Sequence, residues 1–330
     1  MKLLIAFIAV LVLVAIPYIG VKYAGMYYVF GVVVPYAAVL IFISGFIYRV
    51  VKWAQSPVPF RIPTTCGQEK SLPWIKQNKL DNPSSAMGVI GRMALEILCF
   101  RSLFRNTKTE LRDGPRLAYG SDKWLWLAAI VFHWSFLVIL IRHFRLFSQP
   151  VPYFINVLEN VDGFLQIGLP TLYITDILLL AAVLYLFLRR ISIPQVRYIS
   201  LASDYFPLFL IFGIGLTGVL MRYFFRVNVV DVKELAMGLI SFKPKVYTTI
   251  GSLFFIHLFL ISTLFAYFPF SKLMHLGGVF LSPTRNLANN NRMKRHINPW
   301  NYPVKVHTYE EYEDEFRDKM KAAGLPVEKE

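Results

Sequence analysis

Long apolar runs with few charged residues recur along the chain, and most of them end at a lysine or an arginine. A helix needs about 20 apolar residues to cross the hydrocarbon core of a bilayer. Six runs approach this length and are predicted to contain transmembrane helices: Leu3–Val21, Tyr23–Tyr48, about Trp124–Phe147, a stretch within Gly163–Leu188, Tyr205–Met221 and Val246–Ser271. The pattern therefore predicts an all-α integral membrane bundle of six transmembrane helices.

The polar stretches between the runs divide the chain into four predicted parts. These are an N-terminal transmembrane hairpin (1–51), a cytoplasmic segment (52–122), a four-helix core (123–290) and a cytoplasmic tail (291–330). Ser85–Phe104 is predicted as an amphipathic helix, and Thr308–Ala323 as a tail helix that Thr308 caps. A signal peptide is the alternative for the first run. No small-residue cleavage site follows that run, which favours a retained helix.

Composition supports a lipid environment. Apolar residues make up 56% of the 330 residues, charged residues only 17%, and the mean hydropathy is +0.50. A water-soluble domain of this length carries more charge. The two cysteines, Cys66 and Cys99, form no CxxC or CxxCH motif. This excludes a covalently attached c-type heme and argues against an iron–sulfur cluster held by this chain alone.

The formal charge of +15 would indicate nucleic acid in a soluble protein, but here the basic residues lie between apolar runs. Basic residues concentrate in the cytoplasmic loops of membrane proteins. Basic residues are frequent in the connections 52–122 and 189–204 and in the tail after Ser271. The connection 148–169 has no basic residue, and 222–245 has five. The balance predicts a multi-pass protein of the cell inner (cytoplasmic) membrane with both termini cytoplasmic and no nucleic-acid partner.

Four of the six histidines lie in or beside two predicted spans. His133 and His143 share the third span, His257 lies in the sixth, and His275 follows it. Ionisable residues in a lipid-spanning helix are costly and indicate function. Neutral imidazole binds heme iron, and two imidazoles fill both axial positions. Such a heme passes electrons and leaves no open site for oxygen.

Spacing and chain direction predict two hemes at two depths. Ten residues separate His133 from His143, a rise of about 15 Å. Because the third and sixth spans run in opposite directions, His133 pairs with His275 at the inner level and His143 with His257 at the outer level. The 18-residue separation of His257 and His275 corresponds to about 27 Å in a straight helix. Pro269 lies between them and is predicted to kink or end the helix, which absorbs the difference.

The alternative for any single histidine is an interfacial or hydrogen-bonded side chain. Two histidines on each of two antiparallel spans argue against that interpretation for the set of four. Zinc is disfavoured because ligands at two membrane depths cannot converge on one tetrahedral ion. His296 and His307 lie in the polar tail and are predicted as ordinary surface residues.

The arrangement His-x9-His followed by His-x17-His, with FHW at 132–134 and FSKLMH at 270–275, resembles a known family. It is similar to the cytochrome b (gamma, NarI-like) subunit of respiratory nitrate reductase over about residues 120–290. The resemblance implies a nitrate reductase gamma-like di-heme cytochrome b. In that family, too, the first His of one helix pairs with the last His of the other.

The added hairpin, the segments 58–83 and 92–111 and the tail at 298–330 make the chain similar to DsrM-type subunits. These are the membrane cytochromes of the Dsr complex (DsrMKJOP) of sulfate reducers and sulfur oxidisers and of the related Hme complex. The resemblance implies menaquinone as substrate, with its site near the outer heme around His143. It also implies a cytoplasmic iron–sulfur partner resembling heterodisulfide reductase, further membrane and extracytoplasmic subunits, and a role in sulfite, sulfate or sulfur metabolism.

Cationic and small residues near the histidines have two interpretations each. The cations either bind heme propionates or flank the spans as ordinary positive charges. They are Arg142, Arg145 and Arg222 at the outer level, and Lys272 and Arg285 at the inner level. Gly213, Gly215 and Gly218 either face a porphyrin or mediate plain helix contact, which is slightly favoured. Asp176 either accepts protons from a quinol or bonds a neighbouring helix.

The chain has no P-loop, nucleotide-binding glycine motif or iron–sulfur ligand set, so terminal chemistry needs other subunits. The pattern leaves open whether electrons run from menaquinol inward or in reverse. The alternatives are a gamma subunit of a nitrate-reductase-type complex, and a heme-free transporter that uses Asp176 and the histidines as a proton relay.

Overall fold

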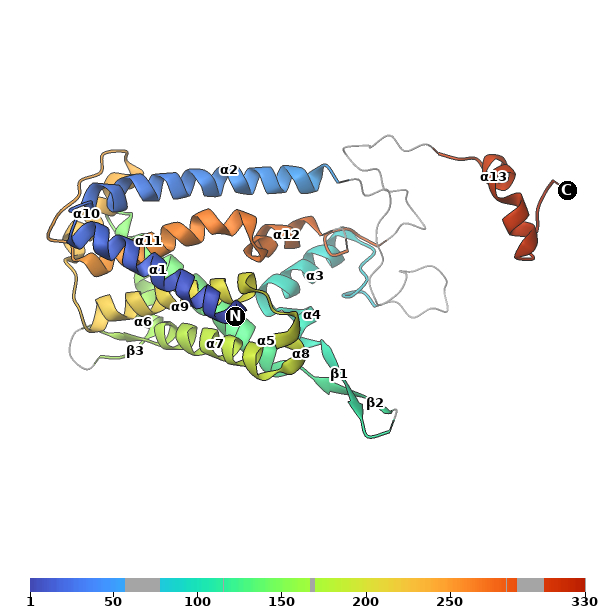
Figure 1. Cartoon of the computed structure of the whole chain (residues 1–330), viewed down its shortest axis with the longest axis horizontal. Coiled ribbons are helices and arrows are strands. Elements are labelled where there is room, and N and C mark those ends of the chain that lie inside the picture. Colours follow the sequence, from blue (N-terminus) through green and yellow to red (C-terminus); the bar gives the residue numbers. More distant parts are fainter. Residues whose placement is uncertain (57–77, 115, 167–169, 283, 290–305, 330) are drawn as a thin grey trace.

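The computed structural model describes residues 1–56, 78–114, 116–166, 170–282, 284–289 and 306–329. Cys66, His296 and most of the 58–83 segment lie outside these residues. The described helices longer than one turn are α1 (Lys2–Lys22), α2 (Val34–Ala54), α3 (Ala86–Cys99), α4 (Arg101–Phe104), α5 (Lys123–His143), α6 (Tyr153–Asp162), α7 (Ile174–Ser192), α8 (Pro194–Ile199), α9 (Ala202–Tyr223), α10 (Val229–Ile240), α11 (Ser252–Tyr267), α12 (His275–Leu281) and α13 (Tyr309–Ala322). The long helices form one elongated bundle (Figure 1).

Five helices of the described chain are long and apolar enough to cross a membrane. They are Lys2–Lys22, Val29–Ala54, Lys123–Leu146, Ala202–Phe224 and Ser252–Phe270, and they correspond to the first, second, third, fifth and sixth predicted spans. Many large apolar side chains on these helices are exposed, for example Leu4, Leu40 and Ile47. Such surfaces are too apolar for water and suit a bilayer.

The fourth span was predicted within Gly163–Leu188, and the structure has a helix in only the second part of this range. Its first part is two short strands, β3 (Gly163–Leu165) and β4 (Leu172–Tyr173), and α7 begins only at Ile174. Gly163 and Pro170 break the helical pattern there. Helix α7 has 19 residues and carries Asp176, Arg189 and Arg190, so its charges separate it from the five apolar spans.

The described chain is mostly helical, in line with the predicted fold class, but it also has short strands that were not predicted. Strands β1 (Thr107–Arg112) and β2 (Arg116–Ser121) form an antiparallel hairpin, with Gly114 at a φ of +76° in the turn. The predicted Ser85–Phe104 helix begins as expected, because the Ser85 hydroxyl caps Gly88 N–H, but it breaks at Phe100, whose φ is +48°. Helices α6, α8 and α10, which lie in the connections, were not predicted.

The end of the sixth span follows the expectation from Pro269. Helix α11 ends at Tyr267, a 3-10 turn spans Phe268–Phe270, a second spans Lys272–Met274, and α12 begins at His275. The Pro269 ring removes a backbone donor and clashes with a continuing helix. His257 and His275 therefore do not lie on one straight helix.

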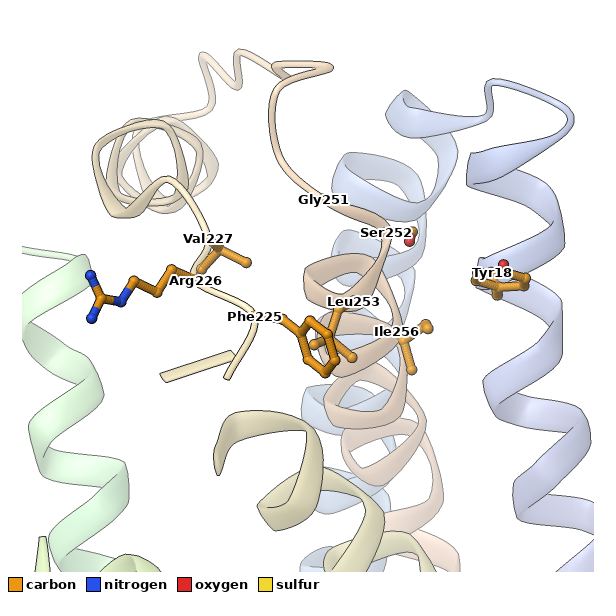
Figure 2. A pocket seen from close by; sticks show the side chains of 8 residues that line it. All are labelled: Tyr18, Phe225, Arg226, Val227, Gly251, Ser252, Leu253 and Ile256. Atoms are coloured by element: carbon orange, nitrogen blue, oxygen red, sulfur yellow. The ribbon is translucent and has the colours of Figure 1, made fainter. Parts of the chain in front are cut away.

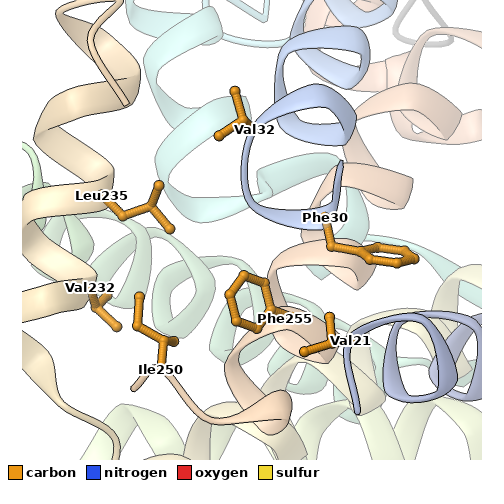
Figure 3. Packing of buried hydrophobic residues seen from close by; sticks show 7 residues of the cluster. All are labelled: Val21, Phe30, Val32, Val232, Leu235, Ile250 and Phe255. Atoms are coloured by element: carbon orange, nitrogen blue, oxygen red, sulfur yellow. The ribbon is translucent and has the colours of Figure 1, made fainter. Parts of the chain in front are cut away.

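The N-terminal hairpin packs directly on the histidine-bearing helix α11. Helix α11 packs on α1, α2 and α9, whereas α5 packs on α7. Figure 3 shows the cluster that joins the end of α1, the π-helical turn Val29–Val33 before α2, α10 and the start of α11. Its buried members are Val21, Phe30, Val32, Val232, Leu235, Ile250 and Phe255. Burying each such side chain contributes about 1.5–3 kcal/mol, so the hairpin fixes the position of α11.

The tail helix has the predicted cap. The Thr308 hydroxyl accepts from Glu311 N–H, and the Glu311 carboxylate accepts from Thr308 N–H, which forms a capping box. Glu313 is buried against the following residues, where the backbone N–H groups of Glu328 and Lys329 hold the pKa of its carboxyl below the usual value. Figure 1 shows α13 apart from the bundle.

Candidate functional site

Two pairs of histidine rings face each other between α5 and α11–α12. The ring centres of His133 and His275 lie 5.9 Å apart, with an interplanar angle of 83°. Those of His143 and His257 lie 6.4 Å apart, with an angle of 20°. The structure thus brings together the same two pairs that the spacing and chain direction predict.

The ring separations fit one metal atom between each pair. Two metal–imidazole bonds of about 2 Å, together with ring radii of about 1.1 Å, place the ring centres about 6 Å apart on opposite sides of one iron. Helices α5 and α11 are not among the closely packed helix pairs of the described chain. The histidine pairs therefore bridge two helices that are held apart, as a flat cofactor between them requires.

All four histidines engage Nδ1 and leave Nε2 for a ligand. His133 Nδ1 lies 2.7 Å from Ala129 O, and His143 Nδ1 lies 2.7 Å from Ile139 O. His275 Nδ1 lies 2.9 Å from Lys272 O. A carbonyl only accepts, so each of these three nitrogens carries the proton and Nε2 keeps its lone pair. His257 Nδ1 lies 2.8 Å from the Thr217 hydroxyl of α9.

Arg142 lies beside the His143 pair and already has carboxylate partners. Its Nη2 lies 2.5 Å from Asp176 Oδ1, and its Nε lies 3.3 Å from Asp162 Oδ2. Asp162 also accepts from the N–H and the hydroxyl of Thr175, at 2.9 and 2.7 Å. The Arg142 and Asp162 side chains are only 8% and 4% exposed. This buried network joins α5, α6 and α7.

Asp176 bonds neighbouring helices, one of its two predicted roles. Besides Arg142 of α5, it accepts from the Tyr223 hydroxyl of α9 at 3.0 Å. Arg222 donates to the Thr171 carbonyl at 3.1 Å, and its guanidinium lies 4.2 Å from the centre of the Tyr173 ring. Within the described residues, Arg222 has no carboxylate within ion-pair distance.

Two other predicted cations are paired. Arg145 donates to both carboxylate oxygens of Glu159 at 2.7 Å, on the exposed rim of the bundle. The Lys272 ammonium lies 2.6 Å from the Asp204 carboxylate. The Arg190 guanidinium lies 3.9 Å from the same carboxylate. Arg285 has no ion pair with a described residue. Carboxylates of the chain therefore balance the positive charges of Arg145 and Lys272, but not that of Arg285, within the described residues.

The sequence did not single out Arg49, which lies near the His275 pair. Helix α2 packs on α12 through Phe46 beside Gly277 and Trp53 beside Gly278. Arg49 lies between these two aromatic residues on α2, and its guanidinium lies 5.2 Å from the Trp53 ring centre. Its Nε is buried and has no hydrogen-bond partner within the described chain. A buried cationic donor without a partner is a natural contact for an anion.

The three glycines of α9 all lie against side chains of neighbouring helices. A Cβ on Gly213 would lie 3.5 Å from Leu260, and one on Gly215 would lie 3.0 Å from Leu180. A Cβ on Gly218 would lie 3.4 Å from His257 Cε1, an ordinary contact distance. These contacts agree with plain helix packing, the slightly favoured role.

A pocket of about 500 Å³ opens at the His143–His257 end of the bundle (Figure 2). Tyr18 of α1, Phe225 and Val227 after α9, and Ser252 and Ile256 of α11 line it, together with Arg226, Gly251 and Leu253. Ile256 directly precedes His257 in the chain. The walls are mainly apolar, and Tyr18, Ser252 and Arg226 are the lining residues with polar side chains, a composition typical of small-molecule sites.

The polar segment before α5 docks on the His133 pair. The indole N–H groups of Trp126 and Trp134 donate to the carbonyls of Cys99 and Leu98 at 2.8 and 3.1 Å. The Phe100 ring then meets His133 edge-on, with ring centres 4.9 Å apart. The left-handed backbone of Phe100 is a strained conformation of the kind that clusters at functional sites.

Comparison with known proteins identifies the family of the chain. Residues 117–296 match the model of the family described as nitrate reductase gamma subunit. The Hdr-like menaquinol oxidoreductase cytochrome b-like subunit of Archaeoglobus fulgidus is 48% identical over 279 residues, which cover 82% of this chain and 83% of that protein. The subunit of the same name from Archaeoglobus profundus is 43% identical over 273 residues, covering 81% of each chain. The chain therefore belongs to the nitrate reductase gamma subunit family, together with the cytochrome b-like subunits of these archaeal Hdr-like menaquinol oxidoreductases.

Proposed function

We propose that this chain is a di-heme b cytochrome that passes electrons from menaquinol to a cytoplasmic iron–sulfur partner resembling heterodisulfide reductase. The observation that carries the proposal is the pair of facing histidine couples with free Nε2 atoms. His133 and His275 hold the inner heme b, and His143 and His257 the outer one. A bound six-coordinate heme supplies one-electron transfer and offers no site for oxygen.

Cations without a carboxylate partner are the proposed contacts of the heme propionates. At the outer level Arg222 fits best, since Arg142 and Arg145 are already balanced by Asp176 and Glu159. At the inner level the buried, unpartnered Nε of Arg49 fits, whereas Lys272 is paired with Asp204. A charged donor to a partly buried carboxylate gives a strong hydrogen bond.

The pocket of Figure 2 is the proposed menaquinol site. Its volume lies within the range of about 300–1,000 Å³ that is typical of ligand pockets. The aromatic and aliphatic walls suit a naphthoquinol ring. The Tyr18 and Ser252 hydroxyls can accept from the quinol hydroxyls. The pocket adjoins the helix that carries His257, so electrons would enter at the outer pair.

The partner is proposed to dock at the His133–His275 end. The α3–α4 segment, the β1–β2 hairpin, α8 and α12 lie at that end in Figure 1. Lys2 donates to Ser200 O between α8 and α9, which places the start of α1 there too. This arrangement supports six crossings, counting α7, with both termini on the cytoplasmic side of the inner membrane. From the similarity to the archaeal Hdr-like menaquinol oxidoreductase subunits, we also propose assembly with the further subunits of a Dsr- or Hme-type complex in sulfur metabolism.

The purified chain is expected to accept electrons from a reduced naphthoquinone. Anaerobic addition of a soluble menaquinol analogue should reduce the b hemes within seconds, as followed by the α-band absorbance. Ser252→Phe, which fills the pocket, should slow this step at least tenfold while the heme content stays the same.

Ser241→Phe is the matched control, because Ser241 is a hydroxyl residue after α10 that does not line the pocket. Hemes that dithionite reduces but the quinol analogue does not would contradict the proposed electron donor. A normal rate in Ser252→Phe would contradict the proposed pocket.

The two hemes are expected to differ in their electron paramagnetic resonance (EPR) spectra. Ligand planes at right angles leave the two iron orbitals that overlap the imidazole π systems nearly equal in energy, whereas near-parallel planes split them. The angle of 83° at His133–His275 therefore predicts a strongly anisotropic low-spin signal, and the 20° at His143–His257 a rhombic one. Two signals of one type, or loss of the rhombic signal in His133→Ala, would contradict the assignment.

A further inference from the structure

We propose that Thr217 of α9 is a positioning residue for His257. Its hydroxyl accepts the Nδ1–H of the imidazole, orients Nε2 toward the outer heme iron and lowers the reduction potential of that heme alone. This inference rests on the proposed function, since it takes His257 as an iron ligand. It assigns a role to a helix that carries none of the four histidines.

The contact is buried and tight. Thr217 Oγ1 lies 2.8 Å from His257 Nδ1, and the two residues are 8% and 7% exposed. Helix α9 packs along α11, and Gly218, the residue after Thr217, lies beside the ring: a Cβ there would be 3.4 Å from His257 Cε1. Thr217 belongs to α9 and His257 to α11, so the hydrogen bond ties the imidazole to a second helix. It therefore opposes rotation of the ring about the Cβ–Cγ bond.

The surroundings of the hydroxyl determine the direction of the bond. Thr217 Oγ1 lies 2.8 Å from Gly213 O and 3.0 Å from Ile214 O, both on its own helix. A threonine hydroxyl has one hydrogen and two lone pairs, and it donates that hydrogen to a backbone carbonyl here. It therefore accepts from His257 Nδ1. The proton on Nδ1 leaves the Nε2 lone pair free for iron, as at the other three histidines.

His257 differs from the other three in what it donates to. His133, His143 and His275 each donate to a backbone carbonyl of their own segment, which mutation of a side chain cannot remove. His257 donates to a side chain of a neighbouring helix. The outer pair is thus the one in which a replaceable hydroxyl takes part in holding a ligand of the iron.

The bond has an electronic consequence as well as a geometric one. An imidazole that donates its outer N–H becomes a stronger electron donor to the metal. Stronger donation stabilises the ferric form and lowers the potential. Loss of an outer partner of a metal ligand typically changes metal affinity or activity by 10- to 100-fold. A tenfold shift in the oxidised-to-reduced ratio of a one-electron couple corresponds to about 59 mV.

The test is a redox titration of the purified full chain, with EPR spectra of the oxidised protein. Thr217→Val keeps the β-branched shape and removes the hydroxyl, whereas Thr217→Ser keeps the hydroxyl. In Thr217→Val the reduction potential of the outer heme should become more positive. At a fixed applied potential, its oxidised-to-reduced ratio should fall about tenfold. Its rhombic EPR signal should broaden or move, and the inner heme should stay unchanged.

Thr217→Ser should remain close to the wild type in both readouts. Thr263→Val is the matched control, since the Thr263 hydroxyl on α11 donates to Phe259 O of its own helix. The inference is overturned if the outer potential and signal are the same in Thr217→Val as in the wild type, or if both hemes shift equally. A wild-type chain without heme would instead refute the proposed function before this test begins.

Discussion

Replacing either His133 or His275 by alanine is expected to remove one and the same heme, and replacing either His143 or His257 the other. Each substitution deletes one of the two imidazoles that would bind the same iron. The imidazole that remains cannot fill both binding positions alone. Heme content should fall from about two to about one per chain in each variant. The pyridine hemochrome assay and low-temperature spectra of the α-band measure this outcome.

His307→Ala is the control for the histidine series. His307 lies before the tail helix and near Glu311, at 3.9 Å, far from the two pairs in sequence and fold. Both hemes should survive its loss. If His133→Ala and His257→Ala removed the same spectral component, the pairing seen in the ring contacts would not be the pairing at the iron.

Arg142→Leu is expected to have the second largest effect, on stability. Asp162 and Asp176 would keep buried carboxylates without their cation. Removing one partner of a buried ion pair costs about 3–5 kcal/mol, a large part of the about 5–15 kcal/mol that typically stabilises a protein. The apparent unfolding temperature in detergent should fall by on the order of 10 °C.

Arg145→Leu is the matched control for Arg142→Leu. Both arginines lie near the end of the third span, but the Arg145 side chain is 46% exposed and pairs with Glu159 at the rim. Exposed pairs contribute about 0–1 kcal/mol, so this variant should unfold close to the wild-type temperature. Adding Asp176→Asn to Arg142→Leu should recover part of the loss, because one uncompensated charge is gone. Equal effects of the two arginine variants would contradict the account of the network.

The apolar runs predicted five spans well because bilayer thickness sets the length of a spanning helix. Their ends shifted where single residues control the backbone. Gly25, at a φ of +63°, delays the second helix to about Val29, and Gly163 and Pro170 delay α7 to Ile174. The β1–β2 hairpin was missed because its short polar strands carry no strong alternation of apolar residues.

The histidine pairs were predictable because two helix spacings and one antiparallel arrangement fix which side chains share a depth. The partners of the cations were not. Arg142 finds Asp162 and Asp176, which lie 20 and 34 residues away on α6 and α7. Thr217 meets His257 across 40 residues. Such contacts depend on how helices pack, and periodicity in one segment contains no information about the neighbour.

The most direct test of the central claim is the heme content of the purified chain, expressed with ample heme supply. Two axial histidine pairs predict about two b-type hemes per chain by pyridine hemochrome. They also predict a low-spin spectrum that does not change when carbon monoxide is added to the reduced protein. A colourless chain, or a heme that binds carbon monoxide fully, would contradict the account.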